Sequence, residues 1–205
     1  NEISNLCYKL GIDYIDVLNA FKLDNRMRVN NKVPEVMNYM TPGIGYGGSC
    51  FPKDLKTFIK FAKNKNFNLS ILKNVDKINE LQPRFISQII LKNFIKKKVK
   101  SCLILGLTFK ENTDDIRNST SIDLINLLAK SKIKIYVYDP IFTKNLFIKN
   151  KRLFNNKIIC LEKINFMIKY DSIVVNNISK EYKKIIKFYD KKYNSLIFDS
   201  RRAFG

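Results

Sequence analysis

Ser101-Cys-Leu-Ile-Leu105-Gly106 marks the point where this 205-residue chain changes from helical to strand periodicity. A short apolar run that stops at a glycine is typical of a strand buried in a parallel sheet. Similar runs recur at 133–138, 158–161, 171–175 and 196–198. The spacing predicts a helix at 119–130 and a helical turn at 164–168. Strands that alternate with helices predict an α/β fold with a doubly wound parallel sheet.

The carboxyl ends of these strands are where such a sheet binds its ligands. Phe109 and Lys110 follow the first strand at this edge, and Arg201 follows the last strand. The sequence therefore places an aromatic ring and two cations at the expected binding edge.

The first half of the chain has helical periodicity instead. Apolar residues at helical spacing predict helices that start near Ile3, after Asp13, near Pro52 and near Leu69. The last of these helices should kink at Pro83. Residues 25–49 are expected to form a long loop. The change of period near Lys98 predicts two domains, a central helical segment at 1–98 and a sheet domain at 99–205.

A second stretch, Gly43-Ile-Gly-Tyr-Gly-Gly-Ser-Cys50-Phe-Pro-Lys-Asp54, contains four of the seven glycines of the chain. Clustered glycines indicate positive φ angles or a close approach to the backbone. The glycines also fit G-x-G-x-x-G, but no buried strand precedes them, which argues against a dinucleotide fingerprint. Pro52 favours a helix that begins just before it. Cys50 is therefore expected at a helix N-terminus, where partial positive charge favours a thiolate.

Cys50 is the candidate nucleophile of this stretch, with Lys53 adding positive charge and Asp54 one helical turn away. Two interpretations of Asp54 stay open. It either activates a hydrolytic water, because a carboxylate is a common base where histidine is missing, or it balances Lys53 or Arg26. The chain has three other cysteines, Cys7, Cys102 and Cys160. They lie in apolar patterns and are expected to be structural thiols.

Composition excludes several classes of function. Histidine is absent, which excludes Cys-His and Ser-His mechanisms within this chain. The sequence also lacks a C-x-x-C pair, which argues against a zinc site. The net charge is +20, but the lysines are scattered along the whole sequence, so we expect no nucleic-acid partner. No apolar run reaches the ~20 residues of a membrane span. A soluble, cytoplasmic protein is expected.

Five further segments extend the pattern set by the glycine-rich stretch, in a fixed order along the chain. They are Asn1–Asp13, Leu23-Asp-Asn-Arg26, Gly106–Ser119, Tyr138-Asp-Pro140 and Phe198-Asp-Ser-Arg201-Arg202. Together the six segments resemble the UDP-glucose/GDP-mannose dehydrogenase family, and the cysteine segment is most similar to its UDP-glucose 6-dehydrogenase branch. The resemblance covers nearly the whole chain.

The resemblance implies an NAD-dependent enzyme that oxidises a nucleotide-sugar alcohol twice, through a thiohemiacetal and a thioester on Cys50. It implies Asp54 as the second catalytic residue and Lys53 and Arg117 as cofactor contacts. It also implies a Rossmann-like C-terminal domain that binds the UDP-sugar. The substrate contacts that it implies are Arg26, Gly43, Gly45, Tyr46, Gly47, Phe109, Lys110 and Arg201.

Members of this family begin with a nicotinamide-binding domain, and these 205 residues do not contain one. We therefore expect the C-terminal part of an enzyme, inactive alone, that forms a homodimer through the long helix at 69–94. A dehydrogenase for UDP-N-acetylmannosamine or GDP-mannose is the alternative within the family. A nucleotide-sugar-binding dimerisation module without catalysis is the alternative outside the enzymes.

Overall fold

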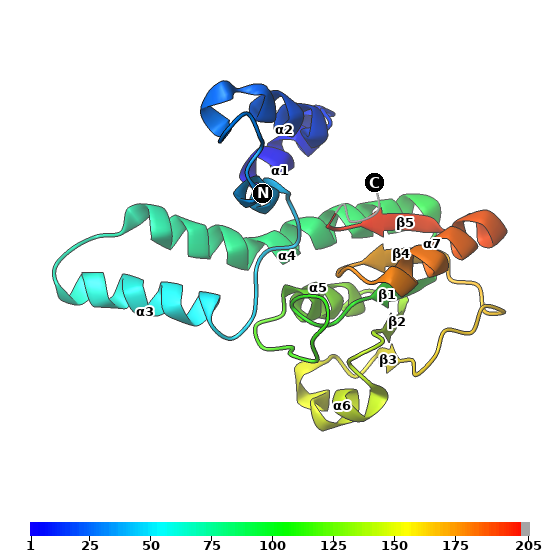
Figure 1. The fold of residues 1–205 in the computed structure, drawn as a ribbon. Coiled ribbons are helices and arrows are strands. Elements are labelled where there is room, and N and C mark those ends of the chain that lie inside the picture. Colours follow the sequence, from blue (N-terminus) through cyan, green and yellow to red (C-terminus); the bar gives the residue numbers. More distant parts are fainter. Residues whose placement is uncertain (202–205) are drawn as a thin grey trace. The chain divides into compact units, whose positions relative to one another are not determined.

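The computed structural model describes residues 1–201, which form two compact units (Figure 1). The first unit is Asn1–Gly43 and the second begins at Ile44. None of the helices in residues 1–201 combines the length and the apolar composition that crossing a membrane requires.

The first unit consists of two α-helices and two 3₁₀ helices. They are α1 (Glu2–Leu10), α2 (Tyr14–Leu23), η1 (Asn25–Met27) and η2 (Glu35–Met40). Gly11, at φ 71°, ends α1, and the Asp13 carboxylate accepts a hydrogen bond from the Ile15 amide to cap α2. Tyr14 is buried beside Cys7, and its hydroxyl donates to the Met40 carbonyl at 2.8 Å. This bond ties the end of the unit to α2.

Residues 25–49 are more structured than the expected loop. Besides η1 and η2, an antiparallel bridge joins Val29 to Lys32, and Asn30 and Asn31 between them have positive φ. Two consecutive left-handed residues make a tight turn that asparagine tolerates better than most residues. The expectation of one long loop was therefore wrong in detail.

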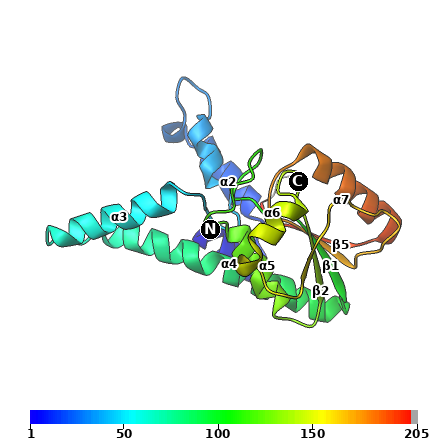
Figure 2. The ribbon, with the colours of Figure 1, turned by 90° about the horizontal axis from the view of Figure 1, so that it is seen from below.

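The first helices of the second unit form a hairpin. They are α3 (Phe51–Asn64) and α4 (Ser70–Lys97), which lie side by side (Figures 1 and 2). Pro83 lies inside α4, which is assigned as one continuous helix. The C-terminal part of α4 packs against α5 (Thr120–Ala129). The long helix and the sheet therefore share one compact unit, and the domain boundary near Lys98 stays a prediction.

The sheet has five parallel strands within the described residues, in the order β3-β2-β1-β4-β5. The strands are β1 (Ser101–Leu105), β2 (Lys134–Tyr138), β3 (Ile158–Cys160), β4 (Ser172–Val175) and β5 (Leu196–Asp199). This order confirms the doubly wound α/β fold. The chain reverses direction of winding between β1 and β4, which is the topological switch point where such folds bind ligands.

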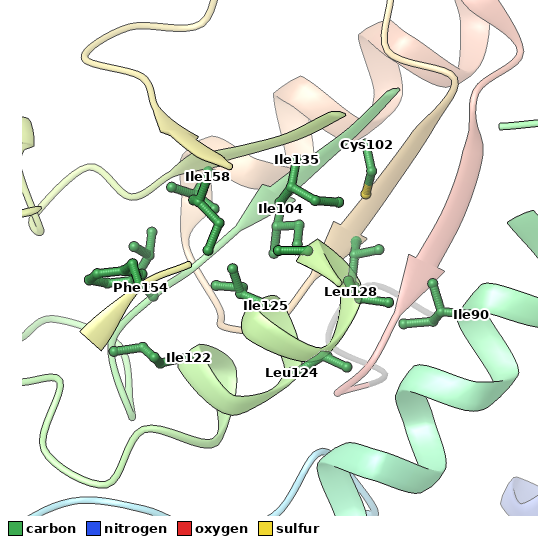
Figure 3. Packing of buried hydrophobic residues seen from close by; sticks show 14 of the residues in the cluster. Ile90, Cys102, Ile104, Ile122, Leu124, Ile125, Leu128, Ile135, Phe154 and Ile158 are labelled. Atoms are coloured by element: carbon green, nitrogen blue, oxygen red, sulfur yellow. The ribbon is translucent and has the colours of Figure 1, made fainter. Parts of the chain in front are cut away.

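Side chains alternate between the two faces of the sheet and build a core on each. Cys102 and Ile104 of β1 point to the face covered by α4 and α5, where they meet Leu124 and Leu128 (Figure 3). Leu103, between them, points to the opposite face. Each fully buried leucine or isoleucine contributes about 1.5–3 kcal/mol relative to an exposed one. A register shift by one residue would exchange the two cores, so the packing fixes the register.

Two helices of the sheet domain escaped the sequence analysis, and one expected turn is wrong. The missed helices are α6 (Lys144–Lys149) and α7 (Lys180–Tyr193), and α7 covers the face of the sheet opposite α5 (Figure 2). Residues 164–168 form no helix; they form a turn in which the Ile168 amide donates to the Asn165 carbonyl at 3.1 Å. A short 3₁₀ helix, η3 (Lys151–Leu153), follows α6.

Candidate functional site

The turn that follows β1 is fixed on all sides by polar groups at the carboxyl edge of the sheet. Gly106 has φ 97°, and a Cβ there would lie 2.5 Å from the Cβ of Asn177, so only glycine fits. The Leu107 amide donates to the Asp139 carboxylate at 2.9 Å, and the Ser119 hydroxyl donates to the Leu107 carbonyl at 2.7 Å. These bonds set the path along which Phe109 and Lys110 leave the sheet.

Arg201 reaches back from the end of β5 to the same turn. Its Nε donates to the Asn176 carbonyl at 2.8 Å, and an Nη donates to the Phe109 carbonyl at 3.4 Å. Burial lowers the pKa of the Arg201 guanidinium below its usual value, yet an arginine stays charged in proteins. Within residues 1–201, no carboxylate forms an ion pair with this guanidinium. A half-buried cation that pairs with no carboxylate of residues 1–201 favours the binding of an anion.

Lys110 supplies a second cation beside the same ring. It is exposed, and its Nζ lies 5.5 Å from the centroid of the Phe109 ring. Among the described residues, Lys110 forms no ion pair either. The structure therefore brings Phe109, Lys110 and Arg201 together, as the sequence predicted. Arg202 lies outside the described residues.

The glycine-rich stretch rests directly on this part of the sheet domain. The Gly48 amide donates to the Arg117 carbonyl at 2.9 Å, and the Asn118 side chain donates to the Gly48 carbonyl at 3.0 Å. A Cβ at Gly47 would lie 2.3 Å from the Asn118 carbonyl oxygen, and a Cβ at Gly48 would lie 2.8 Å from the Phe109 ring. The glycines are therefore needed for contact with the protein itself, and one side of Phe109 is covered by Gly48.

Asn79 of α4 holds the other side of this stretch. Its side chain makes two hydrogen bonds with the backbone of Tyr46. The Asn79 Oδ1 accepts from the Tyr46 N–H at 2.7 Å, and the Asn79 Nδ2 donates to the Tyr46 carbonyl at 2.9 Å. The Tyr46 ring packs edge-on against Phe51 at 4.6 Å between centroids. Its hydroxyl is buried with no hydrogen-bond partner in the described part of the chain, and this burial raises the pKa of Tyr46. A Cβ at Gly45 would lie 2.6 Å from the Asn79 side chain.

Cys50 is the exposed one among the four cysteines and occupies the N-cap position of α3. Its Sγ lies 3.6 Å from the Ser49 hydroxyl. The other thiols are less accessible: Cys7 and Cys102 are buried, and burial raises the pKa of the half-buried Cys160 to about 11. A thiol at a helix N-terminus with solvent access has the environment of a reactive cysteine.

Arg117 is a cation that interacts with Cys50 electrostatically. A bidentate pair with Asp115, with an Nη to oxygen distance of 2.7 Å, raises the pKa of Arg117, and Cys50 adds a smaller effect of the same sign. The same pair lowers the pKa of the Asp115 carboxyl. Arg117 and Cys50 therefore interact electrostatically across this part of the site.

Lys53 and Asp54 follow Cys50 in the first turn of α3 and pair with each other. The Lys53 Nζ lies 3.4 Å from an Asp54 oxygen, and both side chains are exposed. The sequence left open whether Asp54 balances Lys53 or Arg26. The structure pairs Asp54 with Lys53, and Arg26 pairs with Asp24 at 2.6 Å instead. An exposed pair of this kind contributes little to stability. A role of Asp54 in activating water stays a prediction.

Arg26 and Gly43 belong to the first compact unit. The Arg26 guanidinium is 86% exposed and makes a bidentate contact with Asp24. The Gly43 amide donates to the Asn1 side chain at 2.9 Å. Their part in a substrate site therefore stays a prediction.

A cleft of about 860 Å³ opens beside the cysteine segment and is lined by both residues assigned to a cofactor, Lys53 and Arg117. Their positive charges fit the pyrophosphate of a dinucleotide. Carboxylates of Asp76, Glu80 and Asp123 line the same cleft, so its walls carry charges of both signs. Among the residues that the structure describes, no group of His, Cys, Asp and Glu side chains is arranged to hold a metal ion.

The sequence analysis missed the asparagines that hold the site together. Asn79, Asn118, Asn176 and Asn177 each bond to a segment distant in the sequence. Two of these asparagines could have been found from their position in the sequence. Asn176 and Asn177 directly follow an apolar strand and therefore lie at the carboxyl edge of the sheet. In a chain rich in asparagine, this signal is easily overlooked.

Comparisons with known proteins agree with this geometry. The central domain of the UDP-glucose/GDP-mannose dehydrogenase family matches residues 1–81, and the UDP binding domain of the same family matches residues 103–205. The UDP-glucose 6-dehydrogenase of Rickettsia typhi is 32% identical over 98% of this chain and 45% of that protein. The UDP-glucose 6-dehydrogenase YwqF of Bacillus subtilis is 31% identical over 100% of this chain and 44% of that protein.

Solved structures show the same fold. A UDP-glucose dehydrogenase from Pyrobaculum islandicum matches with a TM-score of 0.76 and 26% identity, over 100% of this chain and 44% of that one. A UDP-D-ManNAc dehydrogenase from Pyrococcus horikoshii matches with a TM-score of 0.72 and 22% identity, over 100% and 44% of the two chains. The chain thus spans less than half the length of these relatives. With two domains matched in order along its sequence, this chain belongs to the UDP-glucose/GDP-mannose dehydrogenase family.

Proposed function

We propose that the protein containing this chain is an NAD-dependent UDP-glucose 6-dehydrogenase, and that residues 99–205 bind the UDP moiety of its substrate. One observation carries the proposal: Lys110 and Arg201, which form no ion pair within residues 1–201, lie beside Phe109, and the Phe109 ring lies against Gly48, two residues before Cys50. The nucleophile and an anion-binding site are thereby held in one compact unit. UDP-glucose is favoured as substrate because both curated relatives described above are UDP-glucose 6-dehydrogenases.

The roles of the residues follow from their positions. Lys110 and Arg201 neutralise the diphosphate, and the Phe109 ring packs against the base or ribose. The family resemblance assigns Gly45, Tyr46 and Gly47 to the sugar, and it assigns Arg26 and Gly43 of the first unit to substrate contacts of their own. These assignments rest on the family resemblance and on the charges at the carboxyl edge of the sheet.

The chemistry is a pair of oxidations at one carbon. The sugar alcohol loses a hydride and a proton to give an aldehyde, the Cys50 thiolate adds to that carbon, and loss of a second hydride leaves a thioester. Lys53 and Arg117 would hold the NAD⁺, and each of the two oxidations would use one NAD⁺ as its hydride acceptor. Asp54 takes a proton from the water that hydrolyses the thioester, which releases the acid and restores the thiol. Arg117 stabilises the thiolate before it attacks.

Dimerisation through the helical hairpin is part of the proposal. Phe58, Phe61, Ile71 and Leu81 of α3 and α4 are each about half exposed or more. Apolar side chains gathered on one hairpin favour burial against a second copy. Sedimentation equilibrium of the full chain measures this directly, and a monomer at micromolar concentration would contradict it.

The nucleotide site is tested by calorimetry with UDP. Lys110→Ala should weaken UDP binding by ~1.5–3 kcal/mol, the usual value for a hydrogen bond to a charged group. Lys191→Ala is the matched control, because Lys191 is an exposed lysine of α7. Equal weakening by both changes, abolished by added salt, would show that the attraction is diffuse and that no specific site exists at Phe109 and Lys110.

A further inference from the structure

A chain of hydrogen bonds runs from β4 to the backbone of Lys110 across the switch point of the sheet. Asn177, just after β4, donates from Nδ2 to the Thr108 hydroxyl oxygen at 2.8 Å and to the Thr108 carbonyl at 3.4 Å. The Thr108 hydroxyl donates in turn to the Lys110 carbonyl at 2.8 Å. Asn177 and Thr108 are only 5% and 2% exposed, so these bonds form away from water.

The direction of each bond is determined by its neighbours. The Asn177 Oδ1 accepts from the Ile178 amide at 2.8 Å, so Nδ2 is the atom that faces Thr108. The Thr108 oxygen must then accept from Asn177, which leaves its single proton for the Lys110 carbonyl. No alternative arrangement satisfies all three groups. Thr108 is therefore the connection between β4 and the residue that the proposed function assigns to phosphate.

The surrounding bonds show what this connection controls. The Phe109 amide donates to the Asp115 carbonyl at 3.2 Å, and its carbonyl accepts from Arg201, whose Nε is held by the carbonyl of Asn176. The two asparagines that follow β4 thus reach both cations, Asn177 through Thr108 and Asn176 directly. An arginine side chain and a lysine backbone that are held in place before the ligand arrives lose less conformational entropy on binding.

We propose that Thr108 and Asn177 are positioning residues for nucleotide binding, which place Lys110 and Phe109 relative to Arg201 before a nucleoside diphosphate binds. The inference rests on the proposed function, because it concerns the same site. It adds that UDP affinity depends on a buried hydroxyl that does not touch the ligand.

Calorimetry with UDP on the full chain tests this inference, with unfolding temperature measured on each variant. Thr108→Val keeps the shape of the side chain but removes the hydroxyl, and should raise the Kd about five- to tenfold, the equivalent of one ordinary hydrogen bond. Thr108→Ser restores the hydroxyl and should bind UDP within about twofold of the unchanged chain. This rescue separates positioning from packing, because serine lacks the methyl group that valine keeps.

Ser195→Ala is the matched control for lost stability. Ser195 is 5% exposed, precedes β5 at the opposite edge of the sheet, and donates its hydroxyl to the Tyr170 carbonyl at 2.6 Å. Its loss removes a bond of the same kind and should lower the unfolding temperature without changing the Kd for UDP. Equal weakening of UDP binding by Ser195→Ala and Thr108→Val would overturn the inference.

Lys110→Ala separates the two proposals. If it weakens UDP binding and Thr108→Val does not, the positioning role is wrong and the nucleotide site stands. If Lys110→Ala leaves the affinity unchanged, the nucleotide site is wrong and the inference fails with it. If Thr108→Val and Asn177→Ala both fail to fold at 15 °C, these side chains serve folding, and the positioning role is likewise wrong.

Discussion

Replacing Gly47 by alanine should loosen the contact between the cysteine segment and the sheet domain. The added Cβ would lie 2.3 Å from the Asn118 carbonyl oxygen and 3.1 Å from its carbon. Both are backbone atoms, so no side-chain rotation relieves the collision. Gly47 is not among the glycines with positive φ, and the penalty is therefore steric and not conformational.

The cysteine segment can respond to the added methyl group in two ways, and both lead to a similar loss of stability. If the segment stays in place, overpacking costs about 1–3 kcal/mol. If it moves away, it loses the bonds from Gly48 to Arg117 and from Asn118 to Gly48, at about 1 kcal/mol each. Either route lowers the free energy of unfolding by about 2 kcal/mol, which corresponds to a fall of roughly 4–8 °C in Tm for a chain of this size.

Urea denaturation followed by circular dichroism measures the stability, and iodoacetamide labelling followed by mass spectrometry measures the reactivity of Cys50. Labelling should slow, because Cys50 moves away from the charge of Arg117. Gly11→Ala is the control: its Cβ would meet nothing within 4 Å, and the cost should be limited to the positive φ, about 1 kcal/mol. Unchanged stability and labelling in Gly47→Ala would refute the docking of the cysteine segment on Asn118.

Three further predictions concern catalysis and pH. In the whole enzyme, Cys50→Ser should abolish acid formation, whereas Cys102→Ser should lower the unfolding temperature and spare the product yield; equal catalytic loss would assign packing, not chemistry, to Cys50. The 205 residues alone should produce no NADH from UDP-glucose, and measurable absorbance at 340 nm would contradict this. Because Arg117 lowers the pKa of Asp115 in the folded state, the stability that this pair adds is complete above about pH 4 and is lost as pH falls through the lowered pKa. The difference in urea midpoint between the unchanged chain and Asp115→Asn should therefore shrink on acidification, and a constant difference would show that the pair does not titrate.

The sheet could be predicted from the sequence because its strands are apolar and short. Leu103 and Ile104 point to opposite faces, and both are fully buried, so the run carries the signal of a strand covered on two sides. The helix α7 was missed because charged residues dominate it. Its buried positions, Tyr182, Ile185 and Tyr189, follow helical spacing, but the phenol groups of the two tyrosines give a weaker apolar signal than leucine.

The candidate site was only half visible for a different reason. Cys50, Phe109, Lys110 and Arg201 stand in motifs with a characteristic order of residues. Chain position alone locates Cys50 at a helix N-terminus and the other three at the edge of the sheet. The bonds of Asn79 to Tyr46 and of Asn177 to Thr108 depend on distances across 33 and 69 residues of sequence. No local pattern specifies such partners, because they arise only when α4 and β4 take their places in the fold.

Glycine and asparagine divide the unusual backbone positions of this chain between them. Six of the seven described residues other than glycine with positive φ are asparagines, whereas a Cβ at Gly45, Gly47, Gly48 or Gly106 would come within 3.0 Å of another atom. Left-handed turns that face open space accept either residue. Gly11 is a turn of the open kind, because a Cβ there would meet nothing within 4 Å, and asparagine could take its place. The other four glycines are determined by their neighbours, so a substitution there tests a contact, whereas a substitution at Gly11 tests only a backbone angle.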